Sequence, residues 1–243
     1  MMLSAVDVRR AHALLASNCF YPLVMGSLLS VAFLGTRYGF TGSMRFRFLL
    51  WNLFLAWVPY GCAVALAYLE TDDIVERQTR GKRRRFAWNI LAALWILTLP
   101  NAPYILTDVV HLMNGRRPFR WWFDAGLVLS FAMTGCFLAV ASLRIMHDKV
   151  RLRRGQLVGW VFVVWVSALC GFGIYLGRFL RFNSWDVLTE PWRVLHAVAV
   201  RVLNPLDHPR SAGVTLMFAA LLFVCYAVFF SASRPRHAAD ASR

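Results

Sequence analysis

Charged residues are scarce in this chain of 243 residues, and acidic residues are the scarcest. Asp, Glu, Lys and Arg together make up 16% of the sequence, and Asp and Glu number only 12. A water-soluble domain of this length carries about 25% charged residues. The mean hydropathy of +0.53 agrees, because so large an apolar excess needs lipid around it. The composition therefore excludes an ordinary soluble domain.

The chain also lacks the cysteine spacings and catalytic motifs that would assign a chemistry. Its five cysteines lie singly in or beside apolar stretches, which fits neither a disulfide framework nor a metal site. No serine elbow, HExxH helix, paired-cysteine site or glycine-rich phosphate loop is present. We therefore expect no cofactor. A divalent metal is a minor alternative, because one histidine and scattered aspartates form no diagnostic set of ligands: Asp108, His111, Asp124 and Asp186.

Long uncharged stretches are what the chain does have. About 20 apolar residues cross a bilayer core, and no period-two alternation typical of a barrel strand is seen. Because the backbone in lipid must satisfy its own hydrogen bonds, the stretches are expected to be helices. We predict an all-α fold, a polytopic integral membrane helical bundle forming one transmembrane domain over residues 1–233. Residues 234–243 are expected to be a short, basic, disordered tail. The six predicted spans are Phe20–Thr36, Phe48–Leu69, Phe86–Thr107, Ala125–Leu143, Leu157–Gly177 and Ala212–Ser233.

The net charge of +15 is concentrated in basic clusters at the ends of these spans, as in residues 77–86 and 147–155. Such clusters fix topology and contact anionic phospholipids, so we expect the bilayer as partner and no nucleic acid. With six spans, the side that holds both termini carries 16 Lys and Arg, against 11 on the other side. The positive-inside rule then predicts a bacterial inner-membrane protein with its N- and C-termini in the cytoplasm.

One connection, residues 178–211, is long enough to hold a further helix. Within it, "EPWRVLHAVAVRVLNP" (190–205) places Pro191 in a first helical turn and Asn204–Pro205 at the end. At 100° per residue, Trp192 and Leu195 share an apolar face, while Arg193 lies on the opposite face. This amphipathic pattern predicts one interfacial helix on the outer surface of the bundle.

Helix breakers and titratable groups interrupt the third span, in "LPNAPYILTDVVHL" (99–112). Proline removes a donor and disfavours helical angles in the residue before it, so we expect a break at Leu99 and Ala102. Asn101 is expected to cap a new short helix, on which Asp108 and His111 are neighbours at i, i+3. A break at membrane depth is tolerated where protein or water receives the freed backbone groups.

Other polar residues fall on the same predicted side of the membrane. Asp124 begins the fourth span, Asn52 lies near the start of the second, and Arg178 and Arg181 follow Gly173 and Gly177 at the end of the fifth. Dipole capping by Asp124 and snorkelling of the arginines are sufficient structural explanations for each residue alone. Together, however, they predict a polar pocket. We take Asp108 and His111 as candidate catalytic residues, and as candidate substrate-binding residues Asn52, Asn101, Tyr104, Asp124, Arg178, Arg181, Asn183 and Asp186.

Four stretches resemble recurring motifs of the DUF1361 family, bacterial and archaeal multi-pass membrane proteins of unknown function. They are "WNLFLAWVPY" (51–60), "LPNAPYILTDVVHL" (99–112), "WFDAG" (122–126) and "GIYLGRFLRFNSWD" (173–186). With this order and spacing, the resemblance covers roughly residues 20–230. Only the basic loop at 77–85 and the tail are left unmatched. The resemblance implies a shared polytopic fold and a bacterial inner-membrane location, but no activity, cofactor or ligand.

Three functions remain open at this point. The first is a binding, assembly or signalling component of a membrane system. In that role its partner would be another membrane protein. The second is a membrane-embedded enzyme that acts on a lipid or lipid-linked anionic substrate at the outer leaflet, with His111 or Asp108 as base and the arginines holding the anion. The third is a small-solute transporter, which the position of the break near one end of its span disfavours.

Overall fold

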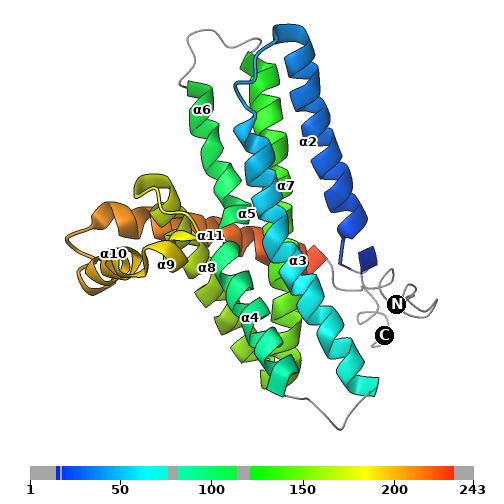
Figure 1. The fold of residues 1–243 in the computed structure, drawn as a ribbon, viewed down its shortest axis with the longest axis vertical. Coiled ribbons are helices and arrows are strands. Elements are labelled where there is room, and N and C mark those ends of the chain that lie inside the picture. The colour runs from blue at the N-terminus through cyan, green and yellow to red at the C-terminus, as the bar shows by residue number, and fades with distance from the viewer. Residues whose placement is uncertain (1–14, 17, 76–81, 114–120, 233–243) are drawn as a thin grey trace, which may run out of the picture.

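The computed structural model describes residues 15–16, 18–75, 82–113 and 121–232, and this part of the chain contains helices and no strand. Figure 1 shows the arrangement. The predicted tail, 234–243, lies outside the described residues. The long helices are α2 (Phe20–Thr41), α3 (Phe48–Val75), α4 (Lys82–Thr98), α7 (Trp121–Arg154), α8 (Gln156–Phe179) and α11 (Pro209–Ala232).

Six segments of the described chain are long and apolar enough to cross a membrane, which confirms the predicted number and the all-α polytopic class. The largest differences from the predicted spans are extensions at charged residues. The first span continues past Thr36 to Thr41, and the fourth runs from Trp121 to Arg154. Arginines ended the predicted windows because they are costly in lipid, but inside a bundle a partnered arginine does not end a helix. The chain is a multi-pass membrane protein.

Helix α7 forms the centre of the bundle. Its 34 residues extend about 50 Å at 1.5 Å per residue, and in Figure 1 it follows the long axis of the molecule beside α2 and α3. A chain of hydrogen bonds joins it to two neighbours. The Trp95 indole N–H donates to Ser142 Oγ at 2.8 Å, and the Ser142 hydroxyl donates to the Pro59 carbonyl at 3.0 Å. These bonds connect α4, α7 and α3 without leaving the polar atoms unpaired in the core.

Close helix contacts depend on glycines that face another backbone. A Cβ added to Gly135 of α7 would lie 2.5 Å from the Ala102 carbonyl oxygen. One added to Gly171 of α8 would lie 2.2 Å from the Thr215 carbonyl oxygen of α11. No side-chain rotation can relieve a clash with backbone. These two contacts therefore set how closely α7 and α8 approach their neighbours.

Replacing Gly171 with alanine should separate α8 from α11 and lower the free energy of unfolding by about 1–3 kcal/mol, the usual cost of overpacking. An SDS titration of the purified protein in mixed micelles measures this change. Gly61 of α3 is the matched control, because a Cβ there meets no atom within 4 Å. Equal unfolding midpoints for the two alanine variants would contradict the tight contact.

The third span is interrupted where the prolines predict, but it is not redirected. After α4, the chain forms α5 (Asn101–Tyr104), the 3-10 helix η1 (Ile105–Val109) and α6 (Val110–Met113). Pro100 keeps right-handed helical angles, and backbone hydrogen bonds from Leu99 to Trp95 and from Ala102 to Leu99 bridge the interruption. The expected cap by Asn101 is therefore wrong: Pro100 occupies the capping position, and the Asn101 amide donates to Ser184 Oγ instead, at 3.1 Å.

The predicted amphipathic helix forms as α10 (Pro191–Leu203), after the short α9 (Asp186–Thr189), and both project to one side of the bundle in Figure 1. Pro191 lies in its first turn and Asn204 at its end, as expected. The apolar residues Trp192 and Leu195 are exposed, whereas Arg201 packs on α8, its Nε 3.3 Å from the Tyr175 hydroxyl. The location of α10 at the membrane surface stays a prediction.

Candidate functional site

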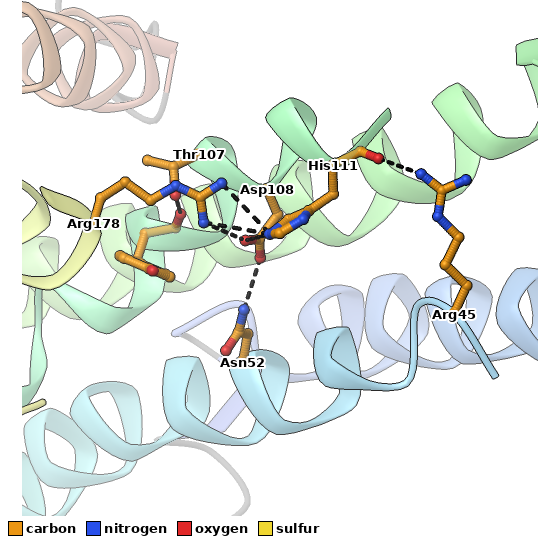
Figure 2. A network of polar contacts seen from close by, with 7 residues as sticks. Arg45, Asn52, Thr107, Asp108, His111 and Arg178 are labelled. Carbon is orange, nitrogen blue, oxygen red and sulfur yellow. Dashed lines mark hydrogen bonds and ion pairs between the residues drawn. The ribbon is translucent and has the colours of Figure 1, made fainter. Parts of the chain in front are cut away.

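The polar residues of the interrupted span gather around Asp108, which η1 turns into the bundle. This carboxylate is 1% exposed. The Asn52 amide of α3 donates to its Oδ2 at 2.7 Å, and Nη1 of Arg178, from the end of α8, approaches Oδ1 at 3.4 Å. Figure 2 shows the three side chains converging from three separate helices. Both carboxylate oxygens therefore have partners within the protein.

Two glycines allow the end of α8 to reach this point. A Cβ on Gly173 would lie 2.6 Å from Pro100 Cγ, and one on Gly177 would lie 3.2 Å from the Tyr104 ring. The face of α8 that carries Gly173 and Gly177 therefore packs on Pro100 and on α5, which follows it. This contact carries Arg178 to Asp108, so the prolines and the glycines act together to build the site.

His111 lies beside this ion pair and is closer to solvent. Its Nε2 is 3.5 Å from both Nη1 and Nη2 of Arg178 and 3.9 Å from Asp108 Oδ1. A guanidinium group only donates, so a neutral His111 presents the lone pair of Nε2 to Arg178. The imidazole packs against Phe48, with 4.8 Å between ring centroids. The side chains of His111 and Arg178 are 39% and 19% exposed, so these two residues form the open edge of the site.

A second arginine reaches His111 from the other side, as Figure 2 shows. Arg45 precedes α3 and donates from Nη2 to the His111 carbonyl oxygen at 2.6 Å. Its guanidinium group also lies over the Phe46 ring, 5.0 Å from the centroid. Because Asp108 is the single carboxylate in these contacts, the group of Arg45, Asp108, His111 and Arg178 has an excess positive charge even when the histidine is neutral. We call these four residues with Asn52 the Asp108 network.

Asp124 belongs to a separate ion pair. Arg37, in the last turns of α2, donates from Nε to Asp124 Oδ1 at 2.7 Å and from Nη2 to Oδ2 at 3.5 Å. Their side chains are 4% and 2% exposed. The Arg37 guanidinium group also lies 4.7 Å from the centroid of the Phe46 ring. The buried Phe46 ring is thus contacted both by Arg37 of this ion pair and by Arg45 of the Asp108 network.

The other predicted binding residues do not share the contacts of the Asp108 network. Asn101 bonds to Ser184, and the Tyr104 ring packs at Gly177. Because α8 ends at Phe179 and Arg181 adopts a left-handed φ of 60°, Arg181 does not continue the helical face of Arg178. The remaining two are partners in a local turn, in which the backbone N–H of Asn183 donates to Asp186 Oδ2 at 2.7 Å.

Sequence reasoning missed three residues that organise this end of the bundle: Arg37, Arg45 and Ser184. Arg37 and Arg45 flank the stretch "GFTGSM" (39–44), whose two glycines resemble a loop, and arginines beside a loop are usually solvated. One signal was available for Arg37. It lies seven residues after Ser30 along a helical period, and both positions are buried in α2.

The side chains that could ligate a metal ion do not cluster in the described residues. No group of three or more His, Cys, Asp or Glu side chains is placed there to hold one. The donor set of the Asp108 network, one carboxylate, one imidazole, one amide and two guanidinium groups, suits an anion better than a cation, because guanidinium groups repel metal ions and bind carboxylates and phosphates.

Comparison with known proteins identifies one family. The model of the family described as "Protein of unknown function (DUF1361)" matches residues 51–225, which include every member of the Asp108 network except Arg45. No curated protein and no solved structure matches the chain.

Proposed function

We infer that this chain, which belongs to the DUF1361 family, is a binding component of a membrane system that holds an anionic group at Arg178 and His111. The observation that carries this proposal is the excess of positive charge in the Asp108 network together with the exposure of these two side chains. The shared chemistry of the ligand is a phosphate or carboxylate group, supplied by a lipid headgroup or by a soluble anion.

The orientation of His111 favours binding over proton transfer. A histidine base is usually oriented by a carboxylate on one ring nitrogen while its other nitrogen is open to the substrate. Here Nε2 of His111 faces both Asp108 and Arg178, and the Asp108 oxygens are engaged by Asn52 and Arg178. The carboxylate is therefore arranged to hold the arginine in place. An arginine has five N–H donors, more than its contacts with Asp108 and His111 need.

Replacing Arg45 with glutamine should weaken anion binding about tenfold, because it removes the excess charge and leaves the Asp108–Arg178 pair in place. His111→Ala should act in the same direction, because a neutral ring that accepts at Nε2 from Arg178 has its N–H donor at Nδ1, and the variant removes it. Calorimetric titration of the detergent-solubilised protein with inorganic phosphate tests a soluble anion. Native mass spectrometry after reconstitution with phosphatidylglycerol or phosphatidylcholine tests a lipid headgroup.

Arg193→Gln is the matched control, because it removes one positive charge from an exposed ion pair with Glu190 on α10. This variant should leave both phosphate binding and lipid binding unchanged. Equal loss in Arg45→Gln and Arg193→Gln would reduce the effect to net charge and overturn the proposed site. Turnover of the added lipid by the wild type, abolished in His111→Ala with binding retained, would replace the binding role with a catalytic one.

We propose further that both termini lie in the cytoplasm of a bacterial cell, with the protein in the inner membrane. The larger number of Lys and Arg on the side of the termini, 16 against 11, supports this orientation. With both termini in the cytoplasm, the Asp108 network lies near the outer face of the membrane. Fusions of alkaline phosphatase and of green fluorescent protein to the C-terminus test it: an active phosphatase and a dark fluorescent fusion would reverse the orientation.

A further inference from the structure

One buried histidine has no part in the Asp108 network. His147 lies in the last turns of α7 and is 0% exposed. Its Nδ1 shares a hydrogen bond with the Tyr226 hydroxyl of α11. Its Nε2 is also buried, and this atom has no hydrogen-bond partner in the described part of the chain. A buried polar atom without a partner is rare in folded proteins and requires a physical explanation.

A tight hairpin between α7 and α8 brings Gly159 against this ring nitrogen. Gly155 alone links the two helices, with a φ of 90° that favours glycine. One turn into α8, a Cβ added to Gly159 would lie 2.7 Å from Nε2 of His147 and 2.9 Å from its Cδ2. A glycine is therefore required for α8 to approach the imidazole, and it offers Nε2 no side-chain acceptor.

Three aromatic rings pack around the imidazole. The ring centroids of Trp160, Tyr226 and Phe230 lie 5.3, 5.6 and 5.3 Å from that of His147. Tyr226 is the titratable group that α11 brings to His147, whereas the titratable residues of α8 begin only at Cys170, about three turns beyond Trp160. His147 therefore lies where α7, α8 and α11 meet, in largely apolar surroundings.

The charged side chains that act on His147 all belong to its own helix: Arg144, Asp148 and Arg151. The Asp148 carboxylate is shared between the two arginines, 3.8 Å from Nε of Arg144 and 3.3 Å from Nη2 of Arg151. One carboxylate and two guanidinium groups leave an excess of positive charge beside the imidazole. This excess opposes the binding of a further proton there.

The donors and acceptors of the contact also suit a neutral imidazole. A neutral His147 can place its one N–H at Nδ1, toward Tyr226, and keep a lone pair at Nε2. A protonated ring donates from both nitrogens, so Nε2 would become a buried donor without an acceptor. Separation of α8 from α7 would give this donor access to water. Proton uptake and closure of the contact are therefore opposed to each other.

We propose that His147 is a proton-sensing residue, around which α7, α8 and α11 close while its imidazole is neutral and open when the imidazole takes up a proton. The ligand of this site is the proton, which needs no cavity. A fall in pH through the ordinary range of histidine, about pH 6.5, then loosens this end of the bundle. The site uses none of the residues of the Asp108 network.

Thiol labelling of the full chain tests the opening. Val163→Cys places a thiol one turn after Gly159 on α8, at a position that is 0% exposed. A histidine that is neutral in the closed contact and ordinary in the open one raises the open population about tenfold from about pH 7.5 to about pH 5.5. Maleimide labelling of this thiol, located by peptide mass spectrometry and divided by its rate in the SDS-unfolded protein at the same pH, should rise by that factor.

Two substitutions in the Val163→Cys protein remove the proton site. His147→Phe keeps an aromatic ring, and His147→Gln keeps a partner for Tyr226, so at least one of them should label slowly at both pH values. The control His196→Phe, at an exposed position on α10, should retain the tenfold rise. A constant rate in the Val163→Cys protein, a tenfold rise in either His147 variant, or fast labelling of both at both pH values would overturn the proposal.

Gly159→Ala tests the contact while keeping the histidine. The added methyl group should hold α8 away from the ring at both pH values. Labelling of the thiol at position 163 should then be fast at the higher pH already, with less than a twofold rise at the lower one. Gly61→Ala, whose Cβ meets no atom within 4 Å, should keep the tenfold rise. Slow labelling and a full rise in Gly159→Ala would show that this contact does not control the opening.

Discussion

Arg37→Met is expected to lower the free energy of unfolding by roughly 3–5 kcal/mol, the cost of leaving one partner of a buried ion pair alone. The ion pair is short, with Nε of Arg37 2.7 Å from Oδ1 of Asp124, and both side chains are almost fully buried. The lost arginine also donates from Nη1 to the Ser43 carbonyl at 3.2 Å. Its removal therefore leaves both the Asp124 carboxylate and the turn after α2 without a donor.

The double variant Arg37→Met with Asp124→Leu separates the cost of an unpaired charge from the value of the pair itself. Replacing a whole buried pair by apolar side chains of similar size is often neutral, so the double variant should recover most of the stability. SDS titration in mixed micelles measures all three proteins. Arg193→Met, at the exposed pair with Glu190, is the control and should leave the unfolding midpoint where it is. A double variant as unstable as Arg37→Met would show that packing over Phe46, and not charge compensation, is what the arginine supplies.

This ion pair also shows where sequence reasoning reached its limit. The apolar windows predicted the six spans because hydrocarbon thickness sets their length, and that information is local. Arg37 ended the first predicted span because an isolated charge is costly in lipid. Its partner, Asp124, is 87 residues away on another helix, and no local pattern encodes that pairing. The prediction that Asp124 begins a helix was sound, but its carboxylate serves the neighbouring helix.

The Asp108 network was more accessible from the sequence, because topology alone brings helix ends on one side together. Asn52, Asp108, His111 and Arg178 are each near the end of a span, and the parity of the spans places all four on the same side. The same reasoning was wrong for Arg181. Residues at i and i+3 face the same direction only within a helix, and α8 ends at Phe179, before Arg181. Helical periodicity therefore predicts which side chains are neighbours within a helix, but it does not apply beyond the end of the helix.

Arg178→Gln should cost about 3 kcal/mol of stability, and Asp108→Asn only about 1 kcal/mol, although they break the same pair. The difference follows from exposure. Asp108 is 1% exposed, whereas the Arg178 side chain is 19% exposed and can turn its charge toward headgroups. Arg178→Gln thus leaves a buried carboxylate uncompensated, while Asp108→Asn leaves a charge that solvates itself. The unfolding midpoint of each purified variant in SDS measures this order.

The double variant Asp108→Asn with Arg178→Gln then separates stability from binding. Its buried groups are neutral, so its abundance in the membrane and its unfolding midpoint should return close to those of Asp108→Asn. Anion binding, measured by phosphate titration and by retained phosphatidylglycerol, should remain at least tenfold weaker than in the wild type, because the guanidinium group is still absent. Recovery of binding together with stability would mean that Arg178 only neutralises Asp108 and that the anion is held elsewhere.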